Sequence, residues 1–191
     1  SSVMLMNVIS GKSIQLSANI VYPDRHIITN IEGTMNGNIY NAMAEMRWDA
    51  DRNEDSRISV NGRGQISGLN NINASITVQC PRRTIAFNVR HSLSNKMTTH
   101  IDFQWEQGKL VVIDTALGDY SKPEGREIIG SLKVATPFND FKSMEAKVNH
   151  QINNVMCKSQ IDVSWNPNKM ISTTVTLKKP FAIYNIDAEV I

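Results

Sequence analysis

Apolar and polar side chains alternate along most of this chain. The segment 14–22 shows the pattern most plainly, with apolar residues at every second position and Gln15, Ser17 and Asn19 between them. Alternation with a period of two is the mark of a β-strand that has one apolar face and one polar face. The apolar members of this segment are Ile14, Leu16, Ala18, Ile20 and Tyr22.

The same alternation returns in segments 74–80, 85–93, 161–165 and 171–177. The segment 139–151 has some helical character, yet its apolar positions also alternate, so we predict a strand there and keep a helix as the alternative. The apolar positions of that last segment and its continuation are Met144, Ala146, Val148 and Ile152.

Short turn sequences separate the alternating runs, and connections this short favour antiparallel pairing of successive strands. The sequence Asn61-Gly62-Arg63-Gly64 is interpreted as a hairpin tip at which glycine supplies a positive φ. The expected reversals are Asn36-Gly37, Asn61-Gly62, Gln107-Gly108, Pro123-Glu124-Gly125 and Asn166-Pro167-Asn168.

Two sets of markers indicate an internal repeat of about 58 residues. In each repeat a proline follows one predicted strand, and a tryptophan ends a later strand. An acidic residue lies three positions before each tryptophan. The prolines are Pro23, Pro81 and Pro137, the tryptophans are Trp48, Trp105 and Trp165, and the acidic residues are Glu45, Asp102 and Asp162.

Together these patterns predict an all-β protein, an extended antiparallel amphipathic sheet of about a dozen strands in four-stranded repeats. Such a sheet could curve or close on itself around lipid. We expect one β-rich domain or a fragment of a longer chain over residues 1–191, with repeats at roughly 14–70, 71–130 and 131–178 and a partial fourth at 179–191.

Composition and charge leave this picture unchanged. The 191 residues are 41% hydrophobic and carry a formal net charge of +2, so nucleic acid is not an expected partner. The chain begins at Ser1 without a charged and apolar leader, which favours a processed fragment. No apolar run reaches the roughly 18 residues of a membrane-spanning helix.

The sequence offers no pattern typical of a catalytic or metal site. It lacks the nucleophile, phosphate-binding and zinc-binding motifs, and its histidines lack ligand spacing, so we read them as outward-facing polar positions. The carboxylates of segment 49–55 lack the order of a calcium loop and lie among arginines. We therefore expect no enzyme, no metal and no cofactor apart from bound lipid. The histidines are His26, His91, His100 and His150.

Three further residues carry candidate modifications. Cys80 and Cys157 are the two cysteines, and their spacing leaves open one disulfide or two free thiols. Asn73, followed by Ala74 and Ser75, matches the pattern of a glycosylation acceptor or is an ordinary loop asparagine.

A broad sheet with one apolar face must cover that face, and lipid acyl chains can do so without shape-specific contacts. We therefore name candidate lipid-facing residues from the apolar positions of the alternating runs. They are Ile76, Val78, Ile85, Phe87, Val89, Ile101, Phe103, Trp105, Ile161, Val163, Trp165, Ile171 and Val175.

The third repeat also resembles a known family. Thr136-Pro137-Phe138 with Phe141, and then Trp165 followed by Asn-Pro-Asn-Lys and a strand rich in Thr and Val, are similar to the repeated β-strand region of large lipid transfer proteins. That family comprises apolipophorins, apolipoprotein B and the more distant vitellogenins. In the first two repeats Pro23 and Pro81 are followed by Asp24 and Arg82 instead of phenylalanine.

The resemblance implies a secreted, extracellular lipoprotein component that binds and transports lipid. Its partners would be phospholipid, acylglycerol and other segments or chains of the same lipoprotein. Family members also serve in yolk storage, clotting and immunity, so the specific role stays open. The alternative from a different class is a structural or adhesive β-sandwich, which binds protein or carbohydrate without lipid and buries its apolar faces against each other.

Overall fold

The computed structural model describes residues 2–49, 51–52, 55–166, 168–178 and 183–190. The described residues form strands of 8 to 11 residues and one three-residue 3-10 turn, Gly68–Asn70, so the predicted all-β class is confirmed. The strands are β1 (Ser2–Ser10), β2 (Ser13–Val21), β3 (His26–Asn36), β4 (Ile39–Trp48), β5 (Arg57–Ile66), β6 (Asn71–Cys80), β7 (Arg83–Leu93), β8 (Lys96–Glu106), β9 (Lys109–Asp119), β10 (Gly125–Ala135), β11 (Ser143–Asn153), β12 (Met156–Trp165), β13 (Lys169–Lys178) and β14 (Ile183–Val190).

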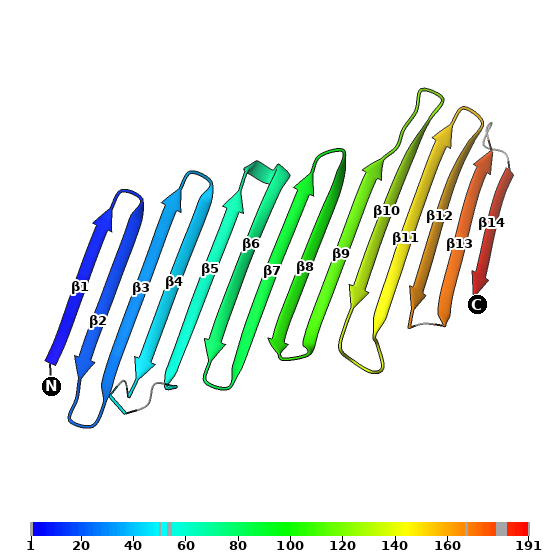
Figure 1. The fold of residues 1–191 in the computed structure, drawn as a ribbon. Helices are drawn as coiled ribbons and strands as arrows, with labels where there is room; N and C mark the ends of the chain where they lie inside the picture. The colour runs from blue at the N-terminus through cyan, green and yellow to red at the C-terminus, as the bar shows by residue number, and fades with distance from the viewer. Residues whose placement is uncertain (1, 50, 53–54, 167, 179–182, 191) are drawn as a thin grey trace. The chain divides into compact units, whose positions relative to one another are not determined.

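The strands follow one another in the sheet in the order of the sequence, from β1 to β14 (Figure 1). This order has two ends, β1 and β14, and does not close. Enclosure of lipid therefore stays a prediction. In the part of the chain that the structure describes, no helix has the length and apolar character needed to cross a membrane.

Contacts divide the chain into two compact units. Unit 1 comprises residues 1–89 with 103–108, and unit 2 comprises residues 90–102 with 109–191. In each unit the paired strands are antiparallel neighbours in the sequence, as the short turn sequences predict.

In unit 1 the register of strand pairing aligns the apolar positions of successive strands. One row runs from Leu16 of β2 to Ile31, Ala44, Val60 and Val78 of β3 to β6, each residue directly opposite the next. A slip by one residue would turn a whole strand's apolar side chains to the other face, so this pattern specifies the register. The result is one face that is apolar across β2 to β6.

Unit 2 shows the same alignment. Leu132 of β10 lies opposite Ala146 of β11, which lies opposite Val163 of β12 and then Ile171 of β13. β11 is a strand throughout, so the strand interpretation of this segment is confirmed and the helical alternative is wrong.

Four of the five expected reversals lie between strands, but the reversal at Asn61-Gly62 is wrong. Gly62 and Gly64 lie inside β5, and neither has a positive φ. The alternation of Ile58, Val60 and Ile66 continues through them, so the Asn-Gly pair is outweighed by pairing on both sides. The chain instead reverses after β5 at Gly68, whose φ is 64°.

The expected repeat length and repeat boundaries stay a prediction. β1 lies before the first expected repeat, and β10 spans the expected boundary at residues 130 and 131. The strands that follow the three marker prolines are β3, β7 and β11, and they begin at residues 26, 83 and 143. Of the expected partial fourth repeat, residues 179–182 and 191 lie outside the described residues, as does Pro167 of the last predicted turn.

No hydrophobic side chain among the described residues is buried. The buried polar residue is Ser59, 7% exposed, whose hydroxyl donates a hydrogen bond to Gln79 Oε1 at 3.2 Å. The apolar side chains that normally form a core therefore remain accessible. This is the property of the fold that bears on function.

Candidate functional site: the apolar faces

The apolar face of unit 1 is the set of side chains that the register places together on one side of β1 to β6. Much of it is accessible, since Leu5 is 75% exposed and Ile9 is 70% exposed. Its members are Val3, Leu5, Ile9, Ile14, Leu16, Ala18, Ile20, Ile27, Ile31, Met35, Tyr40, Ala42, Ala44, Met46, Trp48, Ile58, Val60, Ile66, Ile72, Ala74, Ile76 and Val78.

The apolar face of unit 2 is defined in the same way over β9 to β13. Ile161, at its centre, lies between Val148 and Thr173 and is 47% exposed. Its members are Ile113, Leu117, Ile128, Leu132, Val134, Met144, Ala146, Val148, Ile152, Cys157, Ile161, Val163, Trp165, Ile171, Val175 and Leu177.

The structure places seven of the predicted residues on these faces, and the other six lie on β7 and β8. Ile76 and Val78 lie on the apolar face of unit 1. The predicted residues of β12 and β13 lie on the apolar face of unit 2, where Trp165 is opposite Met144. Ile85, Phe87 and Val89 alternate along β7, as Ile101, Phe103 and Trp105 do along β8.

Phe103 and Trp105 also contact each other. Their ring centroids are 5.6 Å apart and their planes differ by 27°, a stacked arrangement. The predicted lipid-facing residues do not include the apolar residues of β1 to β5 and of β9 to β11, although the alternation of β2 and β11 is evident in the sequence. Their signal is the same alternation, but membership in a continuous face follows only from the strand register.

The opposite face of each unit is mainly polar and is linked by hydrogen bonds and ion pairs. In unit 2, Lys133 Nζ and Lys147 Nζ lie 3.4 Å and 3.2 Å from Glu145 Oε1. The hydrogen bond from Lys147, with the smaller contribution of Lys133, lowers the pKa of Glu145. In unit 1, Gln15 Nε2 donates to Glu32 Oε1 at 3.0 Å.

The acidic residue that recurs before each tryptophan has a partner on this polar side. Glu45 Oε1 lies 2.6 Å from Arg47 Nε, and Asp102 Oδ2 lies 3.3 Å from His100 Nε2. Asp162 accepts hydrogen bonds from Gln160 Nε2 at 2.9 Å and from the hydroxyl of Ser172. The repeated carboxylate therefore has a structural explanation in side-chain bonds across the polar face.

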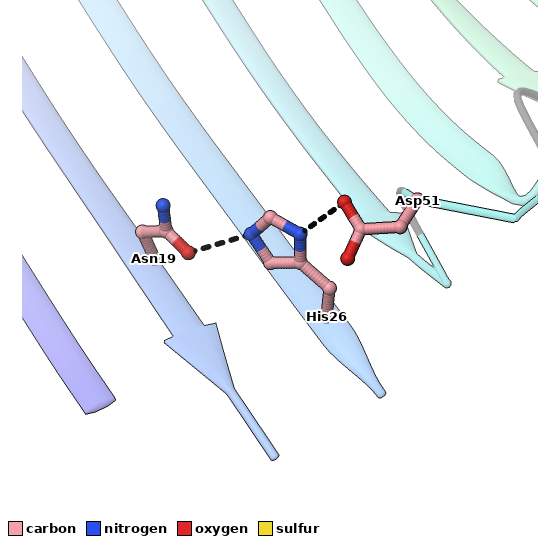
Figure 2. A network of polar contacts seen from close by, with 3 residues as sticks. All are labelled: Asn19, His26 and Asp51. Carbon is pink, nitrogen blue, oxygen red and sulfur yellow. Dashed lines mark hydrogen bonds and ion pairs between the residues drawn. The ribbon is translucent and has the colours of Figure 1, made fainter. Parts of the chain in front are cut away.

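Two of the four histidines follow the expectation of outward polar positions. His26 begins β3 and links two segments of unit 1 (Figure 2): its Nδ1 is 2.8 Å from Asp51 Oδ1 and its Nε2 is 2.8 Å from Asn19 Oδ1. His100 lies between Asp114 Oδ1, 2.6 Å from Nδ1, and Asp102. His26 thus holds the segment after β4 against the end of β2.

For the other two histidines the expectation is wrong, because they share the apolar side of their strands. His91 alternates with Val89 on β7, and its Nδ1 is 2.8 Å from Thr99 Oγ1. His150 lies opposite Ile128, and its Nδ1 is 2.7 Å from Ser159 Oγ. In each case a hydroxyl on the neighbouring strand is the hydrogen-bond partner of the histidine Nδ1, so the polar pair is tolerated among apolar side chains.

A trough crosses the apolar face of unit 1. Its volume is about 650 Å³, and it runs from the turn between β1 and β2 across β3, β4 and β5 to β6. Gly33, Ala42, Gly62 and Gly64 line its middle. It has the size of a small-molecule pocket, although it is open on one side.

The remaining candidates are the cysteines, the glycosylation site and the carboxylate segment. Cys80 and Cys157 are both free thiols. Asn73 is exposed and lies opposite Gln65 inside β6 instead of in a loop. Searched over the described residues, the structure contains no cluster of three or more potential metal ligands. Glu54, of the carboxylate segment 49–55, lies outside the described residues.

Comparison of this chain with protein-family models, with curated proteins and with solved structures finds no match. The apolar faces and the trough are therefore interpreted from their own geometry.

Proposed function

We propose that this chain is a lipid-binding component of an extracellular lipoprotein, and that its apolar faces contact phospholipid and acylglycerol. The observation that carries the proposal is that the described residues bury no hydrophobic side chain while their apolar side chains form continuous faces. Monomeric soluble proteins rarely leave apolar patches of more than a few hundred Å² exposed. The resemblance to large lipid transfer proteins supports the same function, with lipid transport and secretion as its setting.

Lipid fits these faces better than a partner of fixed shape. Full burial of an isoleucine, leucine or valine side chain contributes about 1.5–3 kcal/mol, and this term is non-directional. Each face carries many such side chains, aligned across neighbouring strands by the register, so a fluid layer of acyl chains can cover them together. The function needs no reacting group, so we propose binding and carriage without catalysis.

The adhesive β-sandwich is less well supported. A sandwich packs two sheets face to face and buries side chains between them. The strand order is that of one sheet, and no hydrophobic side chain of the described residues is buried. Lipid therefore remains the proposed occupant of the apolar faces.

A matched pair of variants in β10 tests the proposal. Leu132 lies on the apolar face of unit 2, and its neighbour Ser131 lies on the polar face opposite Lys147. We expect Leu132→Asp to reduce flotation with a triolein emulsion coated with phosphatidylcholine by about tenfold, because a carboxylate would enter the lipid contact. Ser131→Asp should float as the unmodified chain does.

The two residues are neighbours in one strand and are both half-buried, so a carboxylate that merely disrupted the strand would affect both variants equally. Circular dichroism checks that each variant keeps its β-content. Failure of the unmodified chain to float, or equal flotation of the two variants, would contradict the proposal.

A further inference from the structure

The trough on unit 1 has the length of an extended acyl chain. Its lining begins at Ile9 and Ile14, on either side of the first turn, and ends at Ala74 and Ile76 of β6. Five strand spacings separate β1 from β6, which corresponds to about 24 Å at the usual distance between paired strands. The trough therefore lies across the strands and is long and narrow.

Three glycines line the trough at positions where the third repeat has larger side chains, whereas Ala42 corresponds to a residue that is also small. Ala42 lies six residues before Trp48 and opposite Gly33. In the third repeat, the residue six positions before Trp165 is Ser159, and it lies opposite His150.

The next strand shows the same difference. Gly62 lies opposite Ala42, whereas Val175 lies opposite Ser159. Gly64, two residues further, corresponds to Leu177. The first repeat thus lacks the side chains that occupy this part of the apolar face in the third repeat.

Neither backbone geometry nor packing within unit 1 requires these glycines. Gly33, Gly62 and Gly64 have no positive φ. A Cβ on Gly33 or Gly62 would meet only backbone oxygens at 3.9–4.0 Å, and a Cβ on Gly64 would meet nothing within 4 Å. Glycine inside a strand destabilises it and often marks close approach of a ligand.

Charge indicates which end of the trough receives a polar headgroup. Among the described residues that line it none is acidic. Arg63 alternates with Gly62 and Gly64 and lies opposite Ser75, so its side chain belongs to the polar face, and Lys12 is the basic residue that remains for the headgroup. Lys12 is exposed in the turn between β1 and β2, at one end of the trough, whereas the middle is apolar. An amphiphile with one anionic head and one long tail matches this distribution.

We infer that the trough binds one long-chain fatty acid, with its tail over Gly33, Ala42 and Gly62 and its carboxylate beside Lys12. This inference rests on the proposed lipid function and adds a specific site to it. The volume of about 650 Å³ suits one chain and not a multi-chain acylglycerol. The rest of the apolar face keeps its general contact with lipid.

The test compares Ala42→Leu with Ala44→Leu. Both residues lie on the apolar face of β4, but only Ala42 lines the trough. We expect Ala42→Leu to reduce the affinity of the lipid-free chain for palmitate by about tenfold, and Ala44→Leu to change it by less than about threefold. Gly62→Val, which fills the trough from β5, should act as Ala42→Leu does.

The headgroup is tested with Lys12→Gln. This variant should bind palmitate about tenfold more weakly and monopalmitoylglycerol, which has no charge, as the unmodified chain does. An equal loss for both probes, or no loss for palmitate, would overturn the placement of the carboxylate.

Flotation with the emulsion separates this inference from the proposed function. The trough variants should still float, because they keep or enlarge the apolar face. If Ala42→Leu, Gly62→Val and Ala44→Leu bind palmitate equally while all of them float, the fatty-acid site is wrong and the lipid-binding function stands. If the unmodified chain binds palmitate and does not float, the proposed function is wrong.

Discussion

At the scale of single residues, the polar face holds the groups whose protonation the fold changes. His100 is the clearest case, since its two ring nitrogens lie near Asp114 and Asp102. The hydrogen bond to Asp114 is the main cause that raises the pKa of His100, and desolvation opposes it. The sequence showed that His100 has no metal-ligand spacing, but Asp114 lies on another strand, so their contact could not be read from the chain.

This arrangement predicts a pH dependence of stability. Because the pKa of His100 is higher in the folded chain than in the unfolded chain, its contribution is complete below the unfolded value of 6.5. It is lost as pH rises through the folded pKa. Asp114→Asn should lower the pKa of His100, which an NMR titration of the imidazole Cε1 proton measures.

Carboxylates with lowered pKa values act in the opposite direction. The pKa of Glu145 is lowered chiefly by Lys147, and that of Asp119 chiefly by the hydroxyl of Ser121. Their contributions are present above the unfolded pKa values and are lost as the pH falls. In Asp114→Asn the alkaline loss due to His100 should shrink while the acid loss stays. An unchanged titration of His100 would contradict the assignment.

At the scale of elements, the sequence predicted strands better than it predicted turns. Alternation identifies a strand because it records which side chains leave water, and β2, β6, β11 and β12 follow it closely. The prediction of a turn at Asn61-Gly62 is wrong because Asn-Gly favours a hairpin turn by local geometry alone. Pairing with β4 and β6 keeps Gly62 extended, and only the register reveals that its missing side chain opens the trough.

Two glycines in strands should respond in opposite ways to alanine. A Cβ at residue 125 would lie 2.7 Å from the carbonyl oxygen of Ile152, whereas a Cβ at residue 64 has open space. We expect Gly125→Ala to lower the free energy of unfolding by about 1–3 kcal/mol. Gly64→Ala should raise it by about 0.5–1 kcal/mol, because alanine restricts the unfolded chain and suits a strand better.

Chemical denaturation of lipid-free protein measures both changes. Stabilisation by Gly64→Ala would show that glycine at this position does not serve the stability of the sheet. A loss of stability at Gly64 equal to that at Gly125 would show that residue 64 is constrained by packing. Packing within the sheet, and not a ligand, would then account for the glycine at residue 64.

At the scale of the whole molecule, the missing core distinguishes this fold from an ordinary globular protein. Globular domains of this size bury roughly 70% of the surface of the unfolded chain, most effectively through their apolar side chains. Here no hydrophobic side chain of the described residues is buried. The sequence predicted one apolar face, and composition alone could not show whether a second layer covers it, because both cases use the same alternating residues.

This property predicts an unusual heat capacity of unfolding. Exposure of apolar surface is the main source of the heat-capacity increase, about 12–15 cal/mol/K per residue in globular proteins. The lipid-free chain already exposes much of its apolar surface, so scanning calorimetry should give a value well below this range. A value within the range would show that lipid-free protein buries its apolar faces by another route, such as self-association.

Lipid should then stabilise the chain in proportion to the apolar surface it covers. A ligand that binds only the folded state raises the free energy of unfolding by mass action, by about 2.7 kcal/mol at a hundred times its dissociation constant. Emulsion added before the scan should raise Tm for the unmodified chain and for Ser131→Asp, and raise it less for Leu132→Asp. Ala42→Leu fills only the trough and leaves the rest of the apolar face unchanged. It should therefore keep the full rise in Tm with emulsion and lose the rise in Tm that palmitate produces.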